Sequence, residues 1–216
     1  MEIKTDNSLR LRLGRLLGFH PSNLSLKESE IIEAAIRCMS KTSPDTLSLE
    51  RIAQNAGVSR SLMNYYFKSR EDLISKCLLH IRSQYQVHVI DAIKRPLPSA
   101  TSKIKRYLSA VFSWPREKPL HARMWLYHYN KTAIESDWKQ KNTEWVQLGT
   151  DRLSALIEEG HSLGEWSAQD SMKIARQLQA YMTGSLISAL TENNSQSLAE
   201  LAEESFFVFQ KLASKS

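Results

Sequence analysis

The chain has 216 residues, of which 42% are hydrophobic, and its formal charge at pH 7 is +6. This length and composition suit a folded protein with a substantial core, built as one large domain or two modest ones. No apolar run approaches the roughly 18 residues of a membrane span, and the N-terminus lacks the apolar segment of a secretory signal. We therefore expect a cytoplasmic protein without a membrane segment, and the modest positive charge leaves nucleic acid open as a partner.

Helices are expected along the whole chain. Glycine and proline are scarce, and apolar residues recur at helical spacing without the sustained alternation of a half-buried strand, so the predicted fold class is all-α. Helices are predicted over residues 26–41, 49–56, 60–66, 70–94, 101–113, 118–133, 137–159, 168–191 and 197–213. Capping signals support four of these starts. They pair Ser25 with Glu28, Ser69 with Asp72, Ser167 with Asp170, and Ser197 with Glu200.

The first 24 residues mix charge with leucine and lack a clear cap, which predicts an arm or a short extra helix. Arg10, Arg12 and Arg15 in this arm suit contacts in a DNA minor groove. A solvated basic arm fits the same residues, so both interpretations stay open.

The segment LSLERIAQNAGVSRSLMNYYFKSREDLI, residues 47–74, holds two short helical runs on either side of Gly57. Ala53 is small where the two helices must approach, and Val58 and Met63 supply apolar contacts from the turn and the second helix. Glycine can take the positive φ that ends a helix and turns the chain sharply. The pattern predicts a helix-turn-helix with Gly57 at its corner.

The second helix of this motif exposes a face suited to a DNA major groove. Arg60 can pair with guanine and Asn64 with adenine, while Leu62 or the ring edge of Tyr65 can meet a thymine methyl, with Ser61 beside them. Each bidentate pair can discriminate between bases by about 1 to 3 kcal/mol. The residues around this helix suit phosphates, which position a protein without reading sequence. The predicted DNA-binding residues are Ser48, Ser59, Arg60, Ser61, Leu62, Asn64, Tyr65, Tyr66, Lys68 and Arg70.

Positive charge is concentrated in this region. Residues 48–70 carry four cations and one acid, whereas residues 95–216 hold fifteen basic and thirteen acidic residues. A helical hairpin inside a larger α-protein, with its charges merely solvated, is the alternative. The fixed spacing of small residue, glycine, valine and serine cap, followed by a tyrosine pair, favours DNA binding.

These residues resemble the TetR family of bacterial transcriptional regulators, whose motif reads I-A-x-x-A-G-V-S, then a recognition helix ending in Y-x-Y-F or a variant. The resemblance covers about residues 25–80. It implies a three-helix DNA-binding domain and a helical domain for effector binding and dimerisation. Asn64 stands where the family commonly has tyrosine, and Arg70 replaces the usual lysine, so the operator of a relative does not transfer to this chain. The expected domains are an arm at 1–24, a helix-turn-helix domain at 25–84, and an effector-binding and dimerisation domain at 85–216.

Residues 112–145 hold an unusual density of aromatic side chains. Such residues can line a mostly apolar pocket with a few polar groups, and tryptophan faces can accept a cation, although an ordinary core fits any one of them as well. The predicted ligand-binding residues are Trp114, His121, Met124, Trp125, His128 and Trp145. The segments RMWLYHYNKTAIESDWKQKNTEW and EEGHSLGEW are similar to the C-terminal domain of the BetI-type branch, which responds to choline or betaine. This makes a quaternary ammonium one candidate among many apolar effectors.

No metal or cofactor is predicted. Cys38 and Cys77 stand alone and are expected as buried thiols, with a redox-sensing pair as the alternative. His121 and His128 lack a carboxylate or cysteine at metal-ligand spacing.

The last two predicted helices carry more apolar surface than one face needs. In the family, the corresponding helices form a four-helix interface between two subunits, and a C2 dimer would present two recognition helices to successive major grooves. A thick monomeric core is the alternative.

Three functions fit the sequence. The first is a dimeric regulator, most often a repressor in this family, which a small-molecule effector releases from an inverted-repeat operator on double-stranded DNA. The second is a helical enzyme or carrier, but we find none of the phosphate-binding, nucleophile or metalloprotease motifs, and so expect no enzyme. The third is a DNA-architectural protein without an effector.

Overall fold

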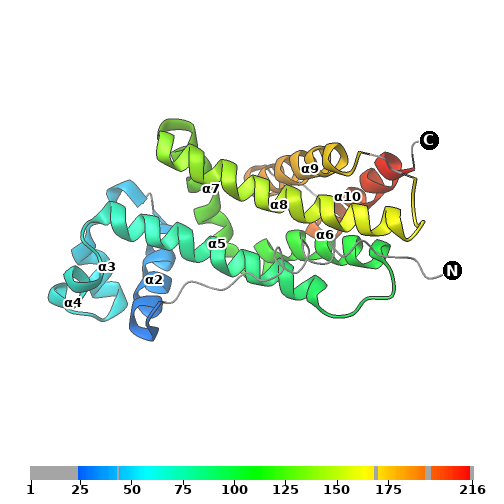
Figure 1. Cartoon of the computed structure of the whole chain (residues 1–216). Helices are drawn as coiled ribbons and strands as arrows, with labels where there is room; N and C mark the ends of the chain where they lie inside the picture. Colours follow the sequence, from blue (N-terminus) through cyan, green and yellow to red (C-terminus); the bar gives the residue numbers. More distant parts are fainter. Residues whose placement is uncertain (1–23, 43, 168–169, 193–195, 215–216) are drawn as a thin grey trace.

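The computed structural model describes residues 24–42, 44–167, 170–192 and 196–214 (Figure 1). All regular structure in these residues is helical, so the predicted all-α fold class is confirmed. The elements are α2 (Leu26–Met39), the short 3-10 helix η1 (Pro44–Thr46), α3 (Leu49–Ala56), α4 (Arg60–Tyr66), α5 (Arg70–Lys94), α6 (Ala100–Glu117), α7 (Pro119–Ile134), α8 (Ser136–Ser162), α9 (Ser171–Thr191) and α10 (Leu198–Ala213).

Residues 1–23 of the predicted arm, and with them Arg10, Arg12 and Arg15, lie outside the part of the chain that the structure describes. Within that part, every helix is too short or too polar to span a bilayer.

Serine side chains cap the starts of six of the helices in the described residues. Five serine hydroxyls each accept a hydrogen bond of 3.0 to 3.2 Å from the backbone N–H three residues ahead, which satisfies a donor that the first helical turn leaves free. Ser197 goes further, because its exchange of hydrogen bonds with Glu200 completes a capping box at the start of α10. The five single caps are Ser25, Ser48, Ser59, Ser69 and Ser99.

Several helix boundaries differ from the prediction by one to four residues, and two of these differences have a clear local feature. Asp170, and not Ser167, caps α9, because its carboxylate accepts a 2.9 Å hydrogen bond from the backbone N–H of Lys173. Helix α6 continues beyond its predicted end, through Pro115 to Glu117. Proline removes one helical hydrogen bond, and the burial of Pro115 against the other helices offsets that loss.

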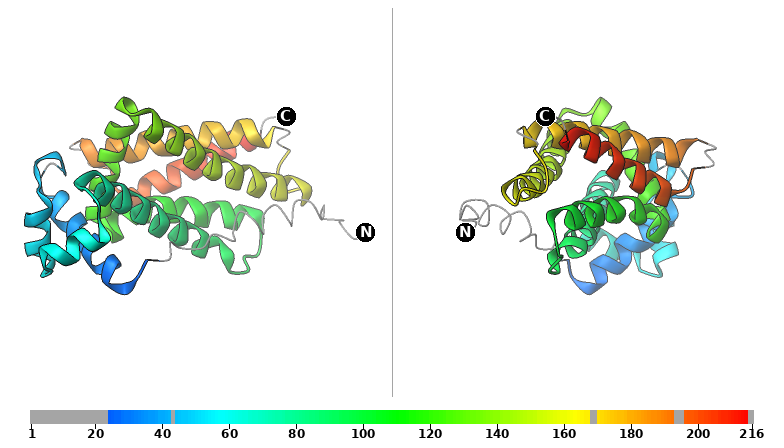
Figure 2. Two further views of the ribbon diagram at one scale, coloured as in Figure 1. Left: turned by 60° about the vertical axis from the view of Figure 1, so that its left-hand side comes forward. Right: turned by 90° about the vertical axis from the view of Figure 1, so that its right-hand side faces the viewer.

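The helices form two groups, one at each end of the molecule, and α5 runs from one group to the other (Figure 1). Helices α2, α3 and α4 gather around the first turns of α5, while α6, α8, α9 and α10 form a bundle at the other end (Figure 1). Helix α10 packs on α6 and α9, and α7 contacts both α2 and α8. The views of Figure 2 show the same arrangement, with the bundle helices side by side.

Two apolar cores underlie these ends. The bundle core is built from α5, α6, α8, α9 and α10 and includes Tyr107, Leu156 and Leu178. The N-terminal core fills the space between α2, α3, α4 and α5, and it also takes in Met124 of α7 and Trp145 of α8. The predicted domain boundary at residue 84 falls inside α5, so the two ends share a helix and part of a core.

Candidate DNA interface and interior cavity

Gly57 forms the corner between α3 and α4. Its backbone is left-handed, with φ 63° and ψ 33°, and the N–H of Val58 donates a 3.0 Å hydrogen bond to the carbonyl of Ala53 to close the helix end. A Cβ on Gly57 would meet no atom within 4 Å. The position therefore requires glycine for its backbone conformation and not for lack of space.

Helix α4 presents a polar face to solvent. Met63 is fully buried in the N-terminal core, so the opposite face of this short helix points outward. Arg60, Ser61 and Asn64 are exposed, and the ring of Tyr65 is 80% exposed. Leu62 at the edge of this face is half-buried, the position expected from the sequence. The side chains predicted to meet base edges are thus accessible together on one helix.

The caps Ser48 and Ser59 each keep a hydroxyl hydrogen available for donation, at the same end of the molecule as α4. The hydroxyl oxygens of Ser48 and Ser59 accept backbone N–H groups at 3.2 and 3.1 Å, and both side chains are exposed. A hydroxyl that accepts through its oxygen still has its own hydrogen to donate. Each cap can therefore donate to a phosphate without releasing its helix.

The predicted phosphate contacts have different surroundings. The side chain of Lys68 is exposed, whereas Arg70 is half-buried and pairs with Glu71 at 3.0 Å. A phosphate at Arg70 has to compete with that carboxylate. The ring of Tyr66 is half-buried and packs edge-on against Tyr65, with 5.0 Å between the ring centroids.

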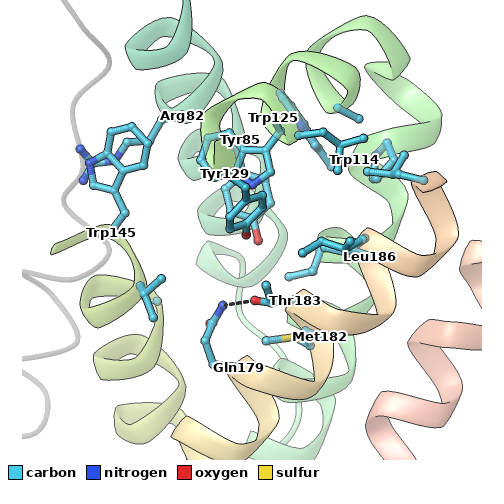
Figure 3. A pocket seen from close by; sticks show the side chains of 18 of the residues that line it. Arg82, Tyr85, Trp114, Trp125, Tyr129, Trp145, Gln179, Met182, Thr183 and Leu186 are labelled. Atoms are coloured by element: carbon cyan, nitrogen blue, oxygen red, sulfur yellow. Dashed lines mark hydrogen bonds between the residues drawn. The ribbon is translucent and has the colours of Figure 1, made fainter. Parts of the chain in front are cut away.

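An interior cavity lies between α5, α6, α7, α8 and α9 (Figure 3). It offers about 90 Å³ to the centres of water-sized molecules, which is room for several waters or one small ligand. Of the six predicted ligand-binding residues, Trp114, Trp125 and Trp145 line it.

The other three predicted ligand-binding residues do not line the cavity, so we leave them out of the proposed site. Met124 is buried in the N-terminal core. His128 hydrogen-bonds Asn142 at 3.1 Å and stacks on Trp145, with 4.7 Å between the centroids. His121 turns toward α2, where its Nε2 meets a carboxylate oxygen of Glu33 at 3.1 Å.

The prediction missed the contribution of α5 and α9. Arg82, Tyr85 and Gln86 of α5 line the cavity, as do Gln179 and Thr183 of α9, where Gln179 donates to the Thr183 hydroxyl at 3.4 Å (Figure 3). The signal in the sequence was polar residues at helical spacing within largely apolar helices. These polar positions lie outside the aromatic segment 112–145, on which the prediction of the ligand site was based.

Arg82 is the charged group of the cavity wall. Its guanidinium lies 4.3 Å from the centre of the Trp145 ring, against which Figure 3 shows it packed. Burial lowers the pKa of Arg82 to about 10, against the opposing effect of the Glu144 carboxylate, and this leaves the guanidinium charged at neutral pH. The buried Nε of Arg82 has no hydrogen-bond partner among the described residues. None of the described residues that line the cavity is an Asp or a Glu.

A second guanidinium lies next to the cavity lining, in contact with Gln86. Arg152 is fully buried, and its Nη2 donates a 2.8 Å hydrogen bond to the Oε1 of Gln86. Because the oxygen of Gln86 is engaged in this way, its amide N–H groups form the donor end of that side chain. The amide orientation follows from the hydrogen bond.

Glu33 joins three helices. Its carboxylate accepts from His80 of α5 at 3.0 Å and from His121 of α7 at 3.1 Å. The hydrogen bond from His121, followed by that from His80, holds the pKa of Glu33 far below its ordinary value. In the described ranges, no group of three or more His, Cys, Asp or Glu side chains could hold a metal ion.

The two cysteines differ in burial. Cys77 is fully buried and its burial raises the pKa of the thiol, as expected for an inert core residue. Cys38 is only half-buried, which corrects the expectation that both thiols are enclosed, and both cysteines are free.

Comparison with known proteins gives three kinds of match. The family model described as bacterial regulatory proteins, tetR family, matches residues 31–77, from α2 into α5. The HTH-type transcriptional regulator BetI of Proteus mirabilis (strain HI4320) is 25% identical over 131 residues, which are 59% of this chain and 62% of that relative. The aligned part thus spans less than two thirds of the relative's length.

Solved structures share the fold. A transcriptional regulator from Saccharomonospora viridis, determined in complex with choline, superposes with a TM-score of 0.78 at 16% identity, over 88% of this chain and 98% of the other. A transcriptional regulator from Pseudomonas aeruginosa PAO1 gives a TM-score of 0.75 at 17% identity, over 88% and 93% of the two chains. At these identities the likeness concerns the fold alone.

Proposed function

The chain belongs to the TetR family of bacterial regulatory proteins, and from this premise we propose that it is a dimeric transcriptional repressor, released from a palindromic operator by a small-molecule effector. The observation that carries the proposal is the exposed polar face of α4, capped by Ser59 and held outward by the burial of Met63. A short, rigid helix with accessible arginine and asparagine side chains suits the major groove. The protein acts in the cytoplasm, where its operator lies.

The DNA contacts divide into two groups. Arg60 pairs with guanine and Asn64 with adenine, and Leu62 or Tyr65 meets a thymine methyl, with Ser61 beside them. The phosphates are bound by a surrounding set that fixes the register of α4 without reading bases. This set comprises Ser48, Ser59, Tyr66, Lys68 and Arg70.

Dimerisation uses α9 and α10. Phe207 of α10 is 58% exposed, and its chain neighbours Phe206 and Val208 are half-buried, so α10 carries apolar surface that the bundle core does not fully cover. A C2 dimer through both helices would bury this surface and set two copies of α4 on successive major grooves. The monomeric alternative would leave Phe207 in water.

The cavity is the proposed effector site, and α5 is the element that transmits binding. Arg82 of α5 lines the cavity, and Arg70 at the start of the same helix lies about 18 Å away along the axis, at the DNA end. A coupling free energy of about 1 to 3 kcal/mol changes DNA affinity by roughly 5- to 150-fold. The choline complex of the S. viridis protein supports a small organic molecule as the effector.

The test is a selection of bound fragments from a random DNA library with the purified protein at two salt concentrations. Enrichment of an inverted repeat is expected, because a symmetric dimer reads two half-sites. Salt-sensitive binding with no enriched motif would contradict the proposal and indicate an architectural protein. Absence of all DNA binding, from a preparation refolded to remove any bound ligand, would reject DNA recognition itself.

A further inference from the structure

Among the described residues, the lining of the cavity carries one positive charge, and the Glu144 carboxylate that acts on Arg82 lies outside this lining. Its described lining includes one guanidinium, on Arg82, and no carboxylate. The other polar side chains of the described lining are neutral and include the amides of Gln86 and Asn142 as well as tyrosine and threonine hydroxyls. Gln86 gives its oxygen to the buried cation Arg152, so its donor end is the one left for a ligand. A negative group is therefore attracted to this part of the cavity, and a positive one is repelled.

The Nε of Arg82 lacks an acceptor among the described residues. This nitrogen is buried. A buried donor on a charged group costs free energy until an acceptor is provided. A carboxylate or a similar anion provides it, and pairs with a guanidinium through short charge-assisted hydrogen bonds.

The aromatic side chains are already engaged with one another. Trp125 stacks between Tyr85 and Trp145, with ring centroids at 6.3 and 5.7 Å, and Arg82 covers Trp145. A quaternary ammonium needs open aromatic faces around it, and here the protein's own guanidinium already takes that place on Trp145. The same rings still offer apolar edges to the body of a ligand.

On these grounds we propose that the effector is a small organic anion, with an aromatic or aliphatic body and one carboxylate-like group that binds Arg82. The proposal rests on the cavity being the effector site. It also gives the ligand a way to act, because an anion that draws Arg82 toward itself loosens the contact between α5 and Trp145. Trp145 belongs to the N-terminal core, so this contact lies between the cavity and the DNA end.

The test is isothermal titration calorimetry of the full chain with ligands matched in shape and different in charge. One series is phenylacetate, phenylacetamide and benzyltrimethylammonium, and a second is hexanoate, hexanamide and pentyltrimethylammonium, with choline added to both. We expect at least one carboxylate to bind at least about tenfold more tightly than its amide, and the ammonium compounds to show no measurable heat. Tighter binding of an ammonium compound, or no binding by either carboxylate, would overturn the proposal.

Two variants test the role of Arg82. Arg82→Gln is expected to lower the affinity for the carboxylate to that of the amide, whereas Arg82→Lys keeps part of the preference. Lys141→Gln is the matched control, because Lys141 is also a cation of an aromatic pair, over Trp138 at 4.6 Å, but does not line the cavity. An unchanged preference in Arg82→Gln would also reject the proposal. The wild-type series stands by itself should that variant not fold.

DNA binding is measured separately, by fluorescence anisotropy with the selected operator fragment. A carboxylate that binds in the calorimeter but leaves DNA affinity unchanged would reject the repressor mechanism while leaving the ligand class intact. An ammonium compound that releases DNA would instead reject the proposed ligand class and leave the repressor mechanism intact.

Discussion

Glu33 of α2 and His121 of α7 are joined by a hydrogen bond of 3.1 Å, although 88 residues separate them in the chain. His80 of α5 binds the other oxygen of the same carboxylate at 3.0 Å. This carboxylate thus connects α2, the first described helix of the DNA-binding end, to α5 and α7. Its contribution to stability can be measured apart from DNA and effector.

Glu33→Gln is expected to destabilise the protein by about 1 kcal/mol at pH 7, because a charged acceptor of two hydrogen bonds is lost from a side chain that is 34% exposed and partly screened by water. The folded state lowers the pKa of Glu33, so this stabilisation is present above the ordinary pKa of glutamate, near 4.5, and declines as the pH falls below it. Urea unfolding at several pH values from 7 to 3 measures it.

The control for this change is Glu30→Gln. Glu30 lies on the same helix and pairs with Lys27 at the surface, so a change below about 0.5 kcal/mol is expected. Equal losses for Glu30→Gln and Glu33→Gln, or a difference between wild type and Glu33→Gln that does not shrink in acid, would contradict the role given to Glu33.

Gly57→Ala is expected to cost about 1 to 2 kcal/mol, because an L-residue at φ 63° is strained even where its Cβ has space. Gly57→Asn should cost less, since asparagine tolerates the left-handed conformation better. Thermal unfolding of both variants gives the comparison, and an alanine variant as stable as wild type would show that the corner relaxes.

Arg60→Ala is expected to relax base preference at one position of each half-site, with a loss of about 1 to 3 kcal/mol for the preferred base. Lys68→Ala should instead weaken binding to all sequences alike and reduce the salt dependence by about one phosphate contact. Competition binding with operator variants at several salt concentrations separates the two effects. Lys139→Ala, an exposed lysine of α8, is the control, and equal loss of specificity in Arg60→Ala and Lys68→Ala would refute the division of roles.

Phe207→Glu is expected to convert the dimer to monomer, because it places a charge in the proposed interface of α9 and α10. Ile134→Glu is the matched control, since Ile134 is 76% exposed at the end of α7 and belongs to neither α9 nor α10. Sedimentation velocity reports the change. A Phe207→Glu protein that remains dimeric would move the interface to another surface.

The helix-turn-helix was predictable because every feature that builds it is local. Ser48, Ser59 and Ser69 cap helices through the backbone three residues ahead, and Gly57 turns the chain between its immediate neighbours. Helical spacing alone predicted that Met63 faces inward and Arg60 outward. In the structure Met63 is buried and Arg60 is exposed.

The cavity depended on tertiary structure. The aromatic segment indicated Trp114, Trp125 and Trp145, but periodicity gives the faces of a helix without saying what each face will meet. His121 lies on α7 with Trp125, yet it faces Glu33 of α2 while Trp125 faces the cavity. Arg82, the one charge in the described lining, lies in the segment 25–84 that the sequence had indicated as the DNA-binding domain. By itself the sequence determined the course of the helices, most of their caps and the polar, exposed face of α4, since these depend on residues within one or two turns. Only the packing of five helices decided which side chains surround the cavity and what charge it presents.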